Sequence, residues 1–377
     1  MHAARWVYNW SLATKKSSYE RDKSKLFKFD LQKQLVLLMR EPEYVWLKDY
    51  VQEIIRYSID NMDSAFKNFF KGNGYPKFKS RRHSKMCFTT HQNKHFSKKF
   101  IGMRIFGEDI RARCSKKNWE DIKNLNRKSI TYSKDSLGHY YASVLVEDLN
   151  EYHLGKLDKT IGIDLGISNF AVTSDGEFIE NPKFFRKSEK KLARAQRILS
   201  RRKKGSKRKD KSKKVVAKLH KKVLRKRQYF IHNVSNKLIN ENQVIVLETL
   251  RIKNMVKNHN LAKSIMDSGW GEFVRQLEYK AIWRGRDIVK ADWHFPSSKT
   301  CSNCGNKKDS LSLKERKYVC NCCGYTQDRD LNAAINLKNL VGGRTSEPIL
   351  VEKPKSTLVE TTKVVNETRN FETFSYI

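Results

Sequence analysis

The spacing of hydrophobic residues divides the chain into a helical region, a β-rich region and a region in which strands and helices alternate. Near the N-terminus, apolar residues recur every three or four positions, or at multiples of that spacing, which is typical of one buried helix face. The recurring positions are Leu47, Val51, Ile54, Met62, Ala65 and Phe69. Gly72 and Gly74, followed by Pro76, predict the end of that helix. We therefore expect residues 1–74 to form a helical region.

Beyond residue 75 the apolar positions alternate, which is typical of strands. Alternation over residues 101–105 and 141–145, together with a turn signal at 134–138, predicts a small β-rich domain over residues 75–155. At its start, Lys77 and Lys79 are interleaved with aromatic residues. This pattern suits contact with a nucleic-acid backbone and nearby bases, and a solvated loop is the alternative.

Residues 156–297 show the pattern of an α/β domain. Strands are predicted at 161–167, 243–249 and 286–293, a hairpin at 169–180, and helices at 183–203, 211–241 and 265–283. A further short helix is predicted at 330–340, and the tail after residue 341 is polar and weakly patterned. We expect that tail, residues 342–377, to be disordered.

Three acidic residues lie on separate elements of this region. Asp164 is in the middle of a strand between Gly162 and Gly166, Glu248 ends a buried strand, and Asp330 begins a helix. An unpaired carboxylate is costly to bury, and we interpret the two glycines as leaving room for a ligand. Three such acids could converge on two Mg²⁺ ions that activate water for phosphodiester cleavage. Each acid alone also fits a structural role, such as a helix cap.

The cysteines indicate a metal centre. Cys301 and Cys304 form one CxxC pair, and Cys320 and Cys323 form a second, with fifteen residues between the pairs. Four thiolates at this spacing complete a closed tetrahedral zinc shell, so we expect one structural Zn²⁺ and a zinc ribbon over residues 298–326. Cys322 lies between two ligands and is spare. A pair of redox dithiols is the alternative.

The charge of the chain points to a polyanionic partner. Lys and Arg number 78 against 40 Asp and Glu, a net charge of +38. Residues 183–227 alone carry 23 Lys and Arg against two acids. Like charges repel along a helix, so this density favours a partner whose phosphates neutralise it. The expected contact residues are Lys203, Lys204, Lys207 and Arg208, and a solvated charged hairpin is the alternative.

Other classes of protein find no support in the sequence. No run of residues approaches the ~18 consecutive apolar residues of a membrane span, and the first residues lack the features of a signal peptide. An odd number of clustered cysteines is typical of a reduced, cytoplasmic protein. There is no GxSxG, P-loop or HExxH motif, so we expect no small-molecule substrate.

Several motifs, taken together and in order, resemble the TnpB (OrfB-type) proteins of bacterial insertion sequences, which are related to type V CRISPR effector nucleases. The motifs are Gly162-Ile-Asp164-Leu-Gly166, Val246-Leu-Glu248, Cys301-Ser-Asn-Cys304-Gly305, Cys320-Asn-Cys-Cys323-Gly324 and Asp328-Arg-Asp330-Leu-Asn332. The resemblance runs from about residue 4 to residue 340. In that family the third acid stands two residues before the Asn, which selects Asp330 over Asp328.

The resemblance implies an α/β multidomain fold. A RuvC nuclease domain of RNase H-like fold would occupy residues 156–297, with a basic helical insertion at 183–241. The zinc ribbon would be inserted before a last RuvC helix at 327–341. Residues 1–74 would form a helical recognition lobe, and 75–155 a wedge domain that grips guide RNA. Asp164, Glu248 and Asp330 would be the ligands of two catalytic Mg²⁺ ions.

The function implied is that of a transposon-encoded, RNA-guided DNA endonuclease of the bacterial cytoplasm. Its partners would be guide RNA and target DNA, with no membrane. Family members usually carry a basic strand and a helix ahead of the segment that begins here at Trp6, so an N-terminally short form is expected. The alternatives are a DNA-binding transposase or recombinase accessory protein, a guide-directed repressor without cleavage, and an inactive truncated remnant.

Overall fold

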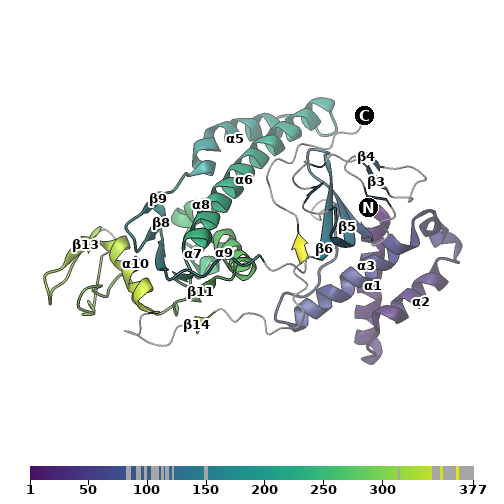
Figure 1. The fold of residues 1–377 in the computed structure, drawn as a ribbon. Coiled ribbons are helices and arrows are strands. Elements are labelled where there is room, and N and C mark those ends of the chain that lie inside the picture. Colours follow the sequence, from purple (N-terminus) through teal and green to yellow (C-terminus); the bar gives the residue numbers. More distant parts are fainter. Residues whose placement is uncertain are drawn as a thin grey trace. The chain divides into compact units, whose positions relative to one another are not determined.

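The structure is a computed structural model that divides into two compact units (Figure 1). Unit 1 comprises Met1–Leu149 with Leu358–Ile377, and unit 2 comprises Asn150–Thr357. The residues described are 1–81, 86–90, 95–96, 100–102, 110–111, 114, 119–120, 123–147, 152–312, 315–341, 349–350 and 362–364. Part of the predicted alternation at 101–105, and most of the tail predicted to be disordered, lie outside these residues. Two described pieces of that tail, residues 349–350 and 362–364, are not disordered, because each pairs with a strand from an earlier part of the chain.

Unit 1 begins with the predicted helices, α1 (His2–Asp22), α2 (Lys28–Leu38), the 3₁₀ helix η1 (Pro42–Asp49) and α3 (Gln52–Phe70). The buried stripe of α3 differs from the one we expected. Ile55, Ile59, Met62 and Phe66 are in the core, whereas Ala65 and Phe69 are only half-buried. The reason is that the backbone is not helical between η1 and α3. A spacing counted from η1 therefore does not continue into α3.

The rest of unit 1 is built from short antiparallel sheets. One sheet has the order β1 (Met86–Thr90), β5 (Asn126–Lys134), β6 (Tyr140–Glu147) and β15 (Thr362–Val364). The other contains β2 (His95–Phe96), β3 (Phe100–Gly102) and β4 (Ile110–Arg111). The predicted turn joins β5 and β6, where the Asp135 carboxylate accepts the backbone N–H groups of Leu137 and His139.

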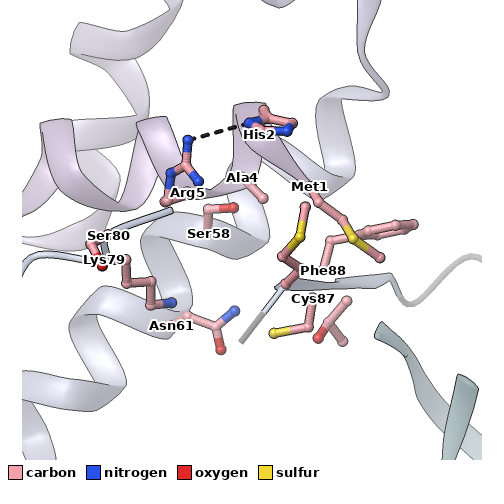
Figure 2. Close-up of a pocket in the computed structure, with 12 residues that line it drawn as sticks. Met1, His2, Ala4, Arg5, Ser58, Asn61, Lys79, Ser80, Cys87 and Phe88 are labelled. Atoms are coloured by element: carbon pink, nitrogen blue, oxygen red, sulfur yellow. Dashed lines mark hydrogen bonds between the residues drawn. The ribbon is translucent and has the colours of Figure 1, made fainter. Parts of the chain in front are cut away.

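A pocket in unit 1 is lined by residues of α1, α3 and β1 and by the segment before β1 (Figure 2). Its lining includes Arg5, Asn61, Lys79 and Cys87. Arg5 also contacts the ring of His2, with 3.3 Å between Nη2 and Nδ1.

Unit 2 is organised around a six-stranded mixed sheet with the order β14-β11-β10-β7-β8-β9. Its strands are β7 (Thr160–Leu165), β8 (Asn169–Thr173), β9 (Phe178–Glu180), β10 (Val244–Leu247), β11 (Asp287–Lys290) and β14 (Ile349–Leu350). β7, β8 and β9 form an antiparallel meander, whereas β10 is parallel to both β7 and β11. The strands predicted near these positions are present, with shorter bounds.

Helices cover both faces of this sheet. They are α5 (Phe184–Ser200), α6 (Lys207–Glu241), α7 (Ile252–Met255), α8 (His259–Ser268), α9 (Trp270–Arg284) and α10 (Arg329–Asn339). On one face, Ile161 and Ile163 of β7 join a core with residues of α6 and α9. The single helix predicted at 265–283 is two helices, because Gly269 takes a positive φ of 73° between them. No helix of the described part of the chain is long and apolar enough to cross a membrane.

Candidate active site and metal centre

Asp164 and Glu248 lie side by side at the carboxyl ends of two parallel strands. Ile163 of β7 is level with Leu247 of β10, so the next residue of each strand, Asp164 and Glu248, lies one step further on the opposite face from the α6–α9 core. The backbone N–H of Leu165 donates to Oε1 of Glu248 over 3.4 Å. Both acids are partly exposed, as a ligand-binding carboxylate must be.

The third acid comes from α10, which packs on the same face of the sheet. Asp328 is the N-cap of this helix, and its Oδ1 accepts the N–H groups of Asp330 and Leu331 at 2.9 and 3.1 Å. Asp330 is in the first turn, where the helix dipole favours a carboxylate. The two acids therefore have different roles, because the oxygen of Asp328 is used by the helix and the side chain of Asp330 is not.

The three carboxylates are close enough to repel one another. Burial, and then repulsion by Glu248 and Asp330, raises the pKa of Asp164 well above its usual range. Burial and the charge of Asp330 raise the pKa of Glu248 to about 7, although the N–H of Leu165 acts against this rise. Hard divalent cations prefer oxygen ligands and would relieve this repulsion. The donor set therefore fits Mg²⁺.

Two arginines that the sequence analysis missed flank Asp330. Nη1 of Arg316 and Nε of Arg329 each lie 3.7 Å from its carboxylate oxygens. Nη2 of Arg316 also donates to the hydroxyl of Ser168, over 3.2 Å, in the loop after β7. Arg316 reaches the site because β12 (Lys317–Val319) pairs with β13 (Thr326–Asp328), and Arg329 N–H donates to the carbonyl of Arg316. The sequence gives no sign that Arg316 lies near Asp330, because this position depends on the register between β12 and β13.

The role that we assigned to the glycines is wrong for Gly162. A Cβ built at this position would lie 2.0 Å from the carbonyl oxygen of Ala334 and 2.5 Å from the amide nitrogen of Lys338. The missing side chain therefore lets α10 approach β7 and leaves no room for a ligand. At Gly166 a Cβ would lie 3.0 Å from the carbonyl oxygen of Asn169, so this residue belongs to a tight turn.

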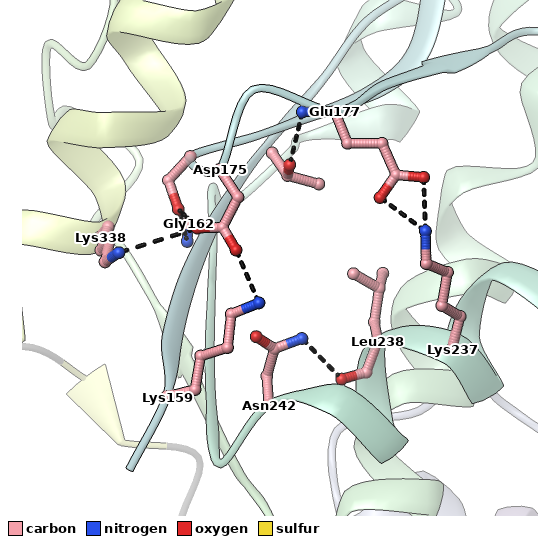
Figure 3. A network of polar contacts seen from close by, with 10 residues as sticks. Lys159, Gly162, Asp175, Glu177, Lys237, Leu238, Asn242 and Lys338 are labelled. Carbon is pink, nitrogen blue, oxygen red and sulfur yellow. Dashed lines mark hydrogen bonds and ion pairs between the residues drawn. The ribbon is translucent and has the colours of Figure 1, made fainter. Parts of the chain in front are cut away.

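One ion pair connects the far end of α10 to the β8–β9 turn (Figure 3). Asp175 lies 2.8 Å from Nζ of Lys159 and 3.7 Å from Nζ of Lys338. Next to it, the hydroxyl of Ser174 accepts the N–H of Gly162 at 3.1 Å. The turn thus contacts both β7 and the end of α10, while the position of Asp330 is set mainly by the close packing of α10 against Gly162 of β7.

The four predicted cysteines come together at one point. Sγ of Cys301 lies 3.7 Å from that of Cys323, and Sγ of Cys304 lies 3.5 Å from that of Cys320. Four thiolates at about 2.3 Å from a zinc ion would be roughly 3.8 Å apart, so the cluster fits Zn²⁺. Gly305 and Gly324 follow the two pairs with positive φ, as tight turns require.

Backbone N–H groups favour the thiolate at Cys320 and Cys323, whereas burial and neighbouring sulfurs raise the pKa values of Cys301 and Cys304 in the metal-free cluster. The N–H groups of Cys323 and Cys322 lower the pKa of Cys320 to about 6. Metal ligands in proteins are mostly His, Cys, Asp and Glu. Within the described ranges, the four cysteines are the only group of three or more such residues whose donor atoms all lie within 4.8 Å of one another. Cys322 is outside the group, and the three acids are spaced more widely than ligands that share one ion.

Two buried asparagines connect the cysteine cluster to α10. Asn332 accepts the N–H of Ser302 at 2.9 Å and donates to the carbonyl of Thr300 at 2.7 Å. Asn336, one turn later, donates to the carbonyls of Ser297 and Thr300. The first CxxC loop is thus attached to the helix that carries Asp330.

The basic segment forms a hairpin of α5 and α6 (Figure 1). The four residues proposed for nucleic-acid contact lie at or next to its tip, and all are exposed: Lys203, Lys204, Lys207 and Arg208. At the opposite end, the buried carboxylate of Asp267 accepts the N–H groups of Phe185 and Arg186 and pairs with Arg227 at 2.8 Å. This carboxylate joins the root of the hairpin to α8.

The two basic residues before β1 differ from each other. Lys77 is exposed. Lys79 is half-buried, with Nζ 3.7 Å from the centroid of the Tyr8 ring, and its backbone is bonded on both sides to Asn9. Burial lowers the pKa of Lys79. Both the side chain and the backbone of Lys79 therefore make contacts within unit 1, whereas Lys77 is exposed to solvent.

Family models match two parts of the chain. A family described as "Probable transposase" (OrfB_IS605) matches residues 116–259, and the "Cas12f1-like, TNB domain" matches residues 270–337. The second match includes all four cysteines and Asp330.

Similar proteins extend over most of the chain. A protein of Streptomyces pristinaespiralis named "Putative RNA-guided DNA endonuclease" is 33% identical over 341 residues, covering 88% of this chain and 82% of that protein. The Escherichia coli (strain K12) protein "Putative RNA-guided DNA endonuclease InsQ" is 30% identical over 356 residues, covering 89% and 86%.

A solved structure has the same fold. A chain of the cryo-EM structure of a Cas12f1–sgRNA–target DNA complex aligns with a TM-score of 0.55 at 16% identity, covering 89% of this chain and 80% of that one. Because both relatives named above match this chain over more than four-fifths of their own length, it belongs to the TnpB (OrfB-type) family.

Proposed function

We propose that this protein is an RNA-guided DNA endonuclease with its active site at Asp164, Glu248 and Asp330. One observation carries the proposal. Two of these acids are level on adjacent parallel strands, and the third is close enough to raise the pKa values of both. The names and coverage of the relatives support the same activity.

The sheet and α10 would together be the RuvC-like nuclease domain. The strand order β9-β8-β7-β10-β11, with three antiparallel strands followed by two parallel ones, supports an RNase H-like assignment. In this assignment the helices of unit 1 are the recognition lobe and its sheets the wedge domain. The α5–α6 hairpin is then an insertion between β9 and β10.

The acids would bind two Mg²⁺ ions, which activate the attacking water and stabilise the leaving oxygen of the phosphodiester. The contribution of the protein itself is to keep the three carboxylates in position to bind the ions. Leu165 N–H orients Glu248, and because Asp328 caps α10, the side chain of Asp330 is not needed as a helix cap. Arg316 is suited to contact the phosphate, because a guanidinium binds phosphate oxygens in a planar, bidentate manner.

The four cysteines would bind one structural Zn²⁺ and keep no position open for chemistry. Its effect on the reaction would be indirect. The asparagine bonds from Thr300 and Ser302 to α10 mean that an ordered ribbon supports Asp330.

Cleavage by single-residue variants tests the proposal. The full chain would be co-expressed with the RNA encoded beside its gene and assayed on DNA with Mg²⁺. Asp164→Asn, Glu248→Gln and Asp330→Asn should each reduce cutting by more than about 1,000-fold. Their effects should not add, because the three acids act as one unit. The RNA should copurify with all three variants.

The matched control is Asp328→Asn. Asparagine caps a helix as well as aspartate does, so this variant should keep α10 and should still cut DNA. Loss of cutting in Asp328→Asn with retention in Asp330→Asn would reverse the assignment of the third acid. Undiminished cutting in Asp164→Asn would refute the proposed active site.

The guide-RNA part of the proposal rests on the basic hairpin. A protein with 6–10 phosphate contacts loses about 10³–10⁵-fold in affinity between roughly 50 and 200 mM salt. Replacing Lys203, Lys204, Lys207 and Arg208 by Gln should reduce the slope of log affinity against log salt by about 3 to 4. Lys77→Gln should reduce it by about 1. An unchanged slope in the fourfold variant would show that the hairpin tip does not touch RNA.

A further inference from the structure

An exposed tryptophan stacks on an arginine in unit 2. Trp293 follows β11, and 47% of its surface is exposed, a large apolar area to leave in water. The guanidinium carbon of Arg251 lies 3.4 Å from the centroid of the Trp293 ring, and Arg251 is itself exposed. We call Arg251 and Trp293 the stacked pair.

Strand register puts the loops that carry the stacked pair at the same edge of the sheet as the acidic site. Leu247 of β10 is level with Lys290 of β11, so the next residues, Glu248 and Ala291, are level as well. Arg251 comes three residues after Glu248 on one loop, and Trp293 comes two residues after Ala291 on the other. The hydroxyl of Thr249 donates to the carbonyl of Ala291 over 2.6 Å and holds the two loops together.

Both members of the stacked pair are fixed from behind. The two neighbours of Arg251 in the sequence pack against the core of unit 2, whereas Arg251 itself is exposed. Trp293 lies in a turn closed by Asp292, whose Oδ1 accepts the N–H of His294 at 2.8 Å. The ring centroids of Trp293 and His294 lie 3.0 Å apart. Together with Arg251, this contact holds the Trp293 side chain in place, which reduces the entropy lost when a ligand binds.

The charge around the stacked pair favours a base over a phosphate. The backbone N–H of His294, then its ring and the charge of Arg251, hold the pKa of Asp292 below its usual range. The ionised Asp292 offsets the charge of Arg251 and would repel a phosphate. A planar guanidinium that lies on an aromatic ring is, in contrast, a suitable surface for a nucleobase.

Building on the proposed function, we infer that the stacked pair binds one unpaired base of the DNA strand that is cut, next to the phosphodiester held by the acids. A base inside a duplex has both faces covered, so the strand must be single-stranded at this position. Stacking of this base sets the register of the DNA strand relative to Glu248, and thereby determines which phosphodiester bond is cut.

The test combines a protein variant with a missing base. An abasic nucleotide is placed at successive positions around the mapped cut site, and cleavage is measured at subsaturating DNA. One position should slow the wild type by about 5- to 150-fold, the equivalent of one base–aromatic stack. Trp293→Ala should be slowed by a similar factor on intact DNA and by nothing further on that abasic DNA. Trp293→Phe should restore most of the rate.

Arg251→Lys separates stacking from charge. Arg251→Lys should slow the cleavage of intact DNA as much as Arg251→Ala does, because lysine keeps the positive charge and lacks the planar guanidinium group. The control is Phe178→Ala, which removes an aromatic residue that is 44% exposed on β9, at the opposite edge of the sheet. This variant should cut normally and should remain sensitive to the abasic position.

A binding measurement keeps this inference separate from the proposed function. Single-stranded oligothymidylate with one central 2-aminopurine is bound to the full chain carrying Asp164→Asn. Its fluorescence should be quenched, and adding Trp293→Ala should reduce the quenching. If no protein cuts DNA and the quenching still requires Trp293, the proposed function fails and the base site stands. If the wild type cuts, while Trp293→Ala changes neither rate nor quenching, the inference is wrong.

Discussion

The cysteine cluster and the carboxylate cluster are both groups of anionic ligands, and they are built in opposite ways. The four sulfurs come from two short loops within the single segment from Cys301 to Cys323, and backbone N–H groups aim at them. The three acids come from two strands and a helix and extend from Asp164 to Asp330. The cysteine cluster is stabilised by its own loops, whereas the carboxylate cluster is held together, against its own repulsion, by the packing of α10.

The comparison predicts that the largest effect on folding comes from the cysteines. Structural zinc sites contribute about 10–16 kcal/mol of apparent binding free energy. Cys320→Ser should therefore lose the bound metal and unfold the ribbon, as measured by elemental analysis and limited proteolysis. Cys322→Ser, one loop position away, should retain both. Absence of zinc from the wild type, or loss of zinc from Cys322→Ser, would overturn the assignment of the ligands.

The carboxylate cluster should behave in the opposite way, because removing a charge there stabilises the metal-free protein. The pKa of Glu248 is raised from 4.5 to about 7 in the folded state. The stability that its protonated form contributes is present below about pH 4.5 and is lost as the pH rises to 7. Above pH 7 this loss is roughly 3 kcal/mol. Glu248→Gln should therefore unfold at a higher temperature than the wild type at about pH 7.5, without divalent cations.

Two further measurements sharpen that prediction. The advantage of Glu248→Gln should vanish near pH 4, where the wild-type side chain is protonated. Added Mg²⁺ should raise the unfolding temperature of the wild type more than that of the variant. Equal unfolding temperatures of the two proteins above pH 7 would mean that neither burial nor the neighbouring acids raise the pKa of Glu248 in the folded protein.

The smallest of the three effects concerns the link between the clusters. Asn332→Ala would leave the N–H of Ser302 and the carbonyl of Thr300 without their partner, at a cost of about 2 kcal/mol in unfolding free energy. The zinc content should stay at the wild-type level, because no ligand is removed, while DNA cutting falls as Asp330 loses its support. Chemical denaturation and elemental analysis would check this. Normal cutting in a destabilised Asn332→Ala protein would mean that the two clusters are independent.

The same contrast explains what could be predicted from the sequence. The cysteine cluster was predicted completely, including the spare Cys322, because two turns of fixed geometry determine it. The convergence of Asp164 and Glu248 was predicted from acids on separate elements, but their common face follows only from the pairing of β7 with β10. The function of Gly162 could not be predicted, because a strand pattern shows which residues share a face and not which element covers it. The face of β7 that contains Gly162 is covered by the backbone of α10, a helix from a distant part of the chain.

Long-range contacts account for the other omissions. Arg316 gave no signal among 78 basic residues, and it is identified only by the pairing of β12 with β13. Lys79 matched the same basic and aromatic pattern as Lys77, yet it lies on the ring of Tyr8, a residue of the first helix. Asn336 is spaced one helical turn from Asn332, but its partners in the ribbon loop could not be inferred from that spacing.

Among the residues that the structure describes, the α5–α6 hairpin is attached at its root and exposed at its tip, and this has a consequence for how such proteins diverge and can be re-engineered. Asp267 joins both helices of the hairpin to α8 at its root. The tip at residues 201–205 is exposed, and Gly205 has no atom within 4 Å of the place where a side chain would begin. Exposed tips of this kind accept insertions. The arm can therefore be lengthened, shortened or fused to a foreign domain to follow RNAs of different length, while the nuclease sheet is inherited unchanged.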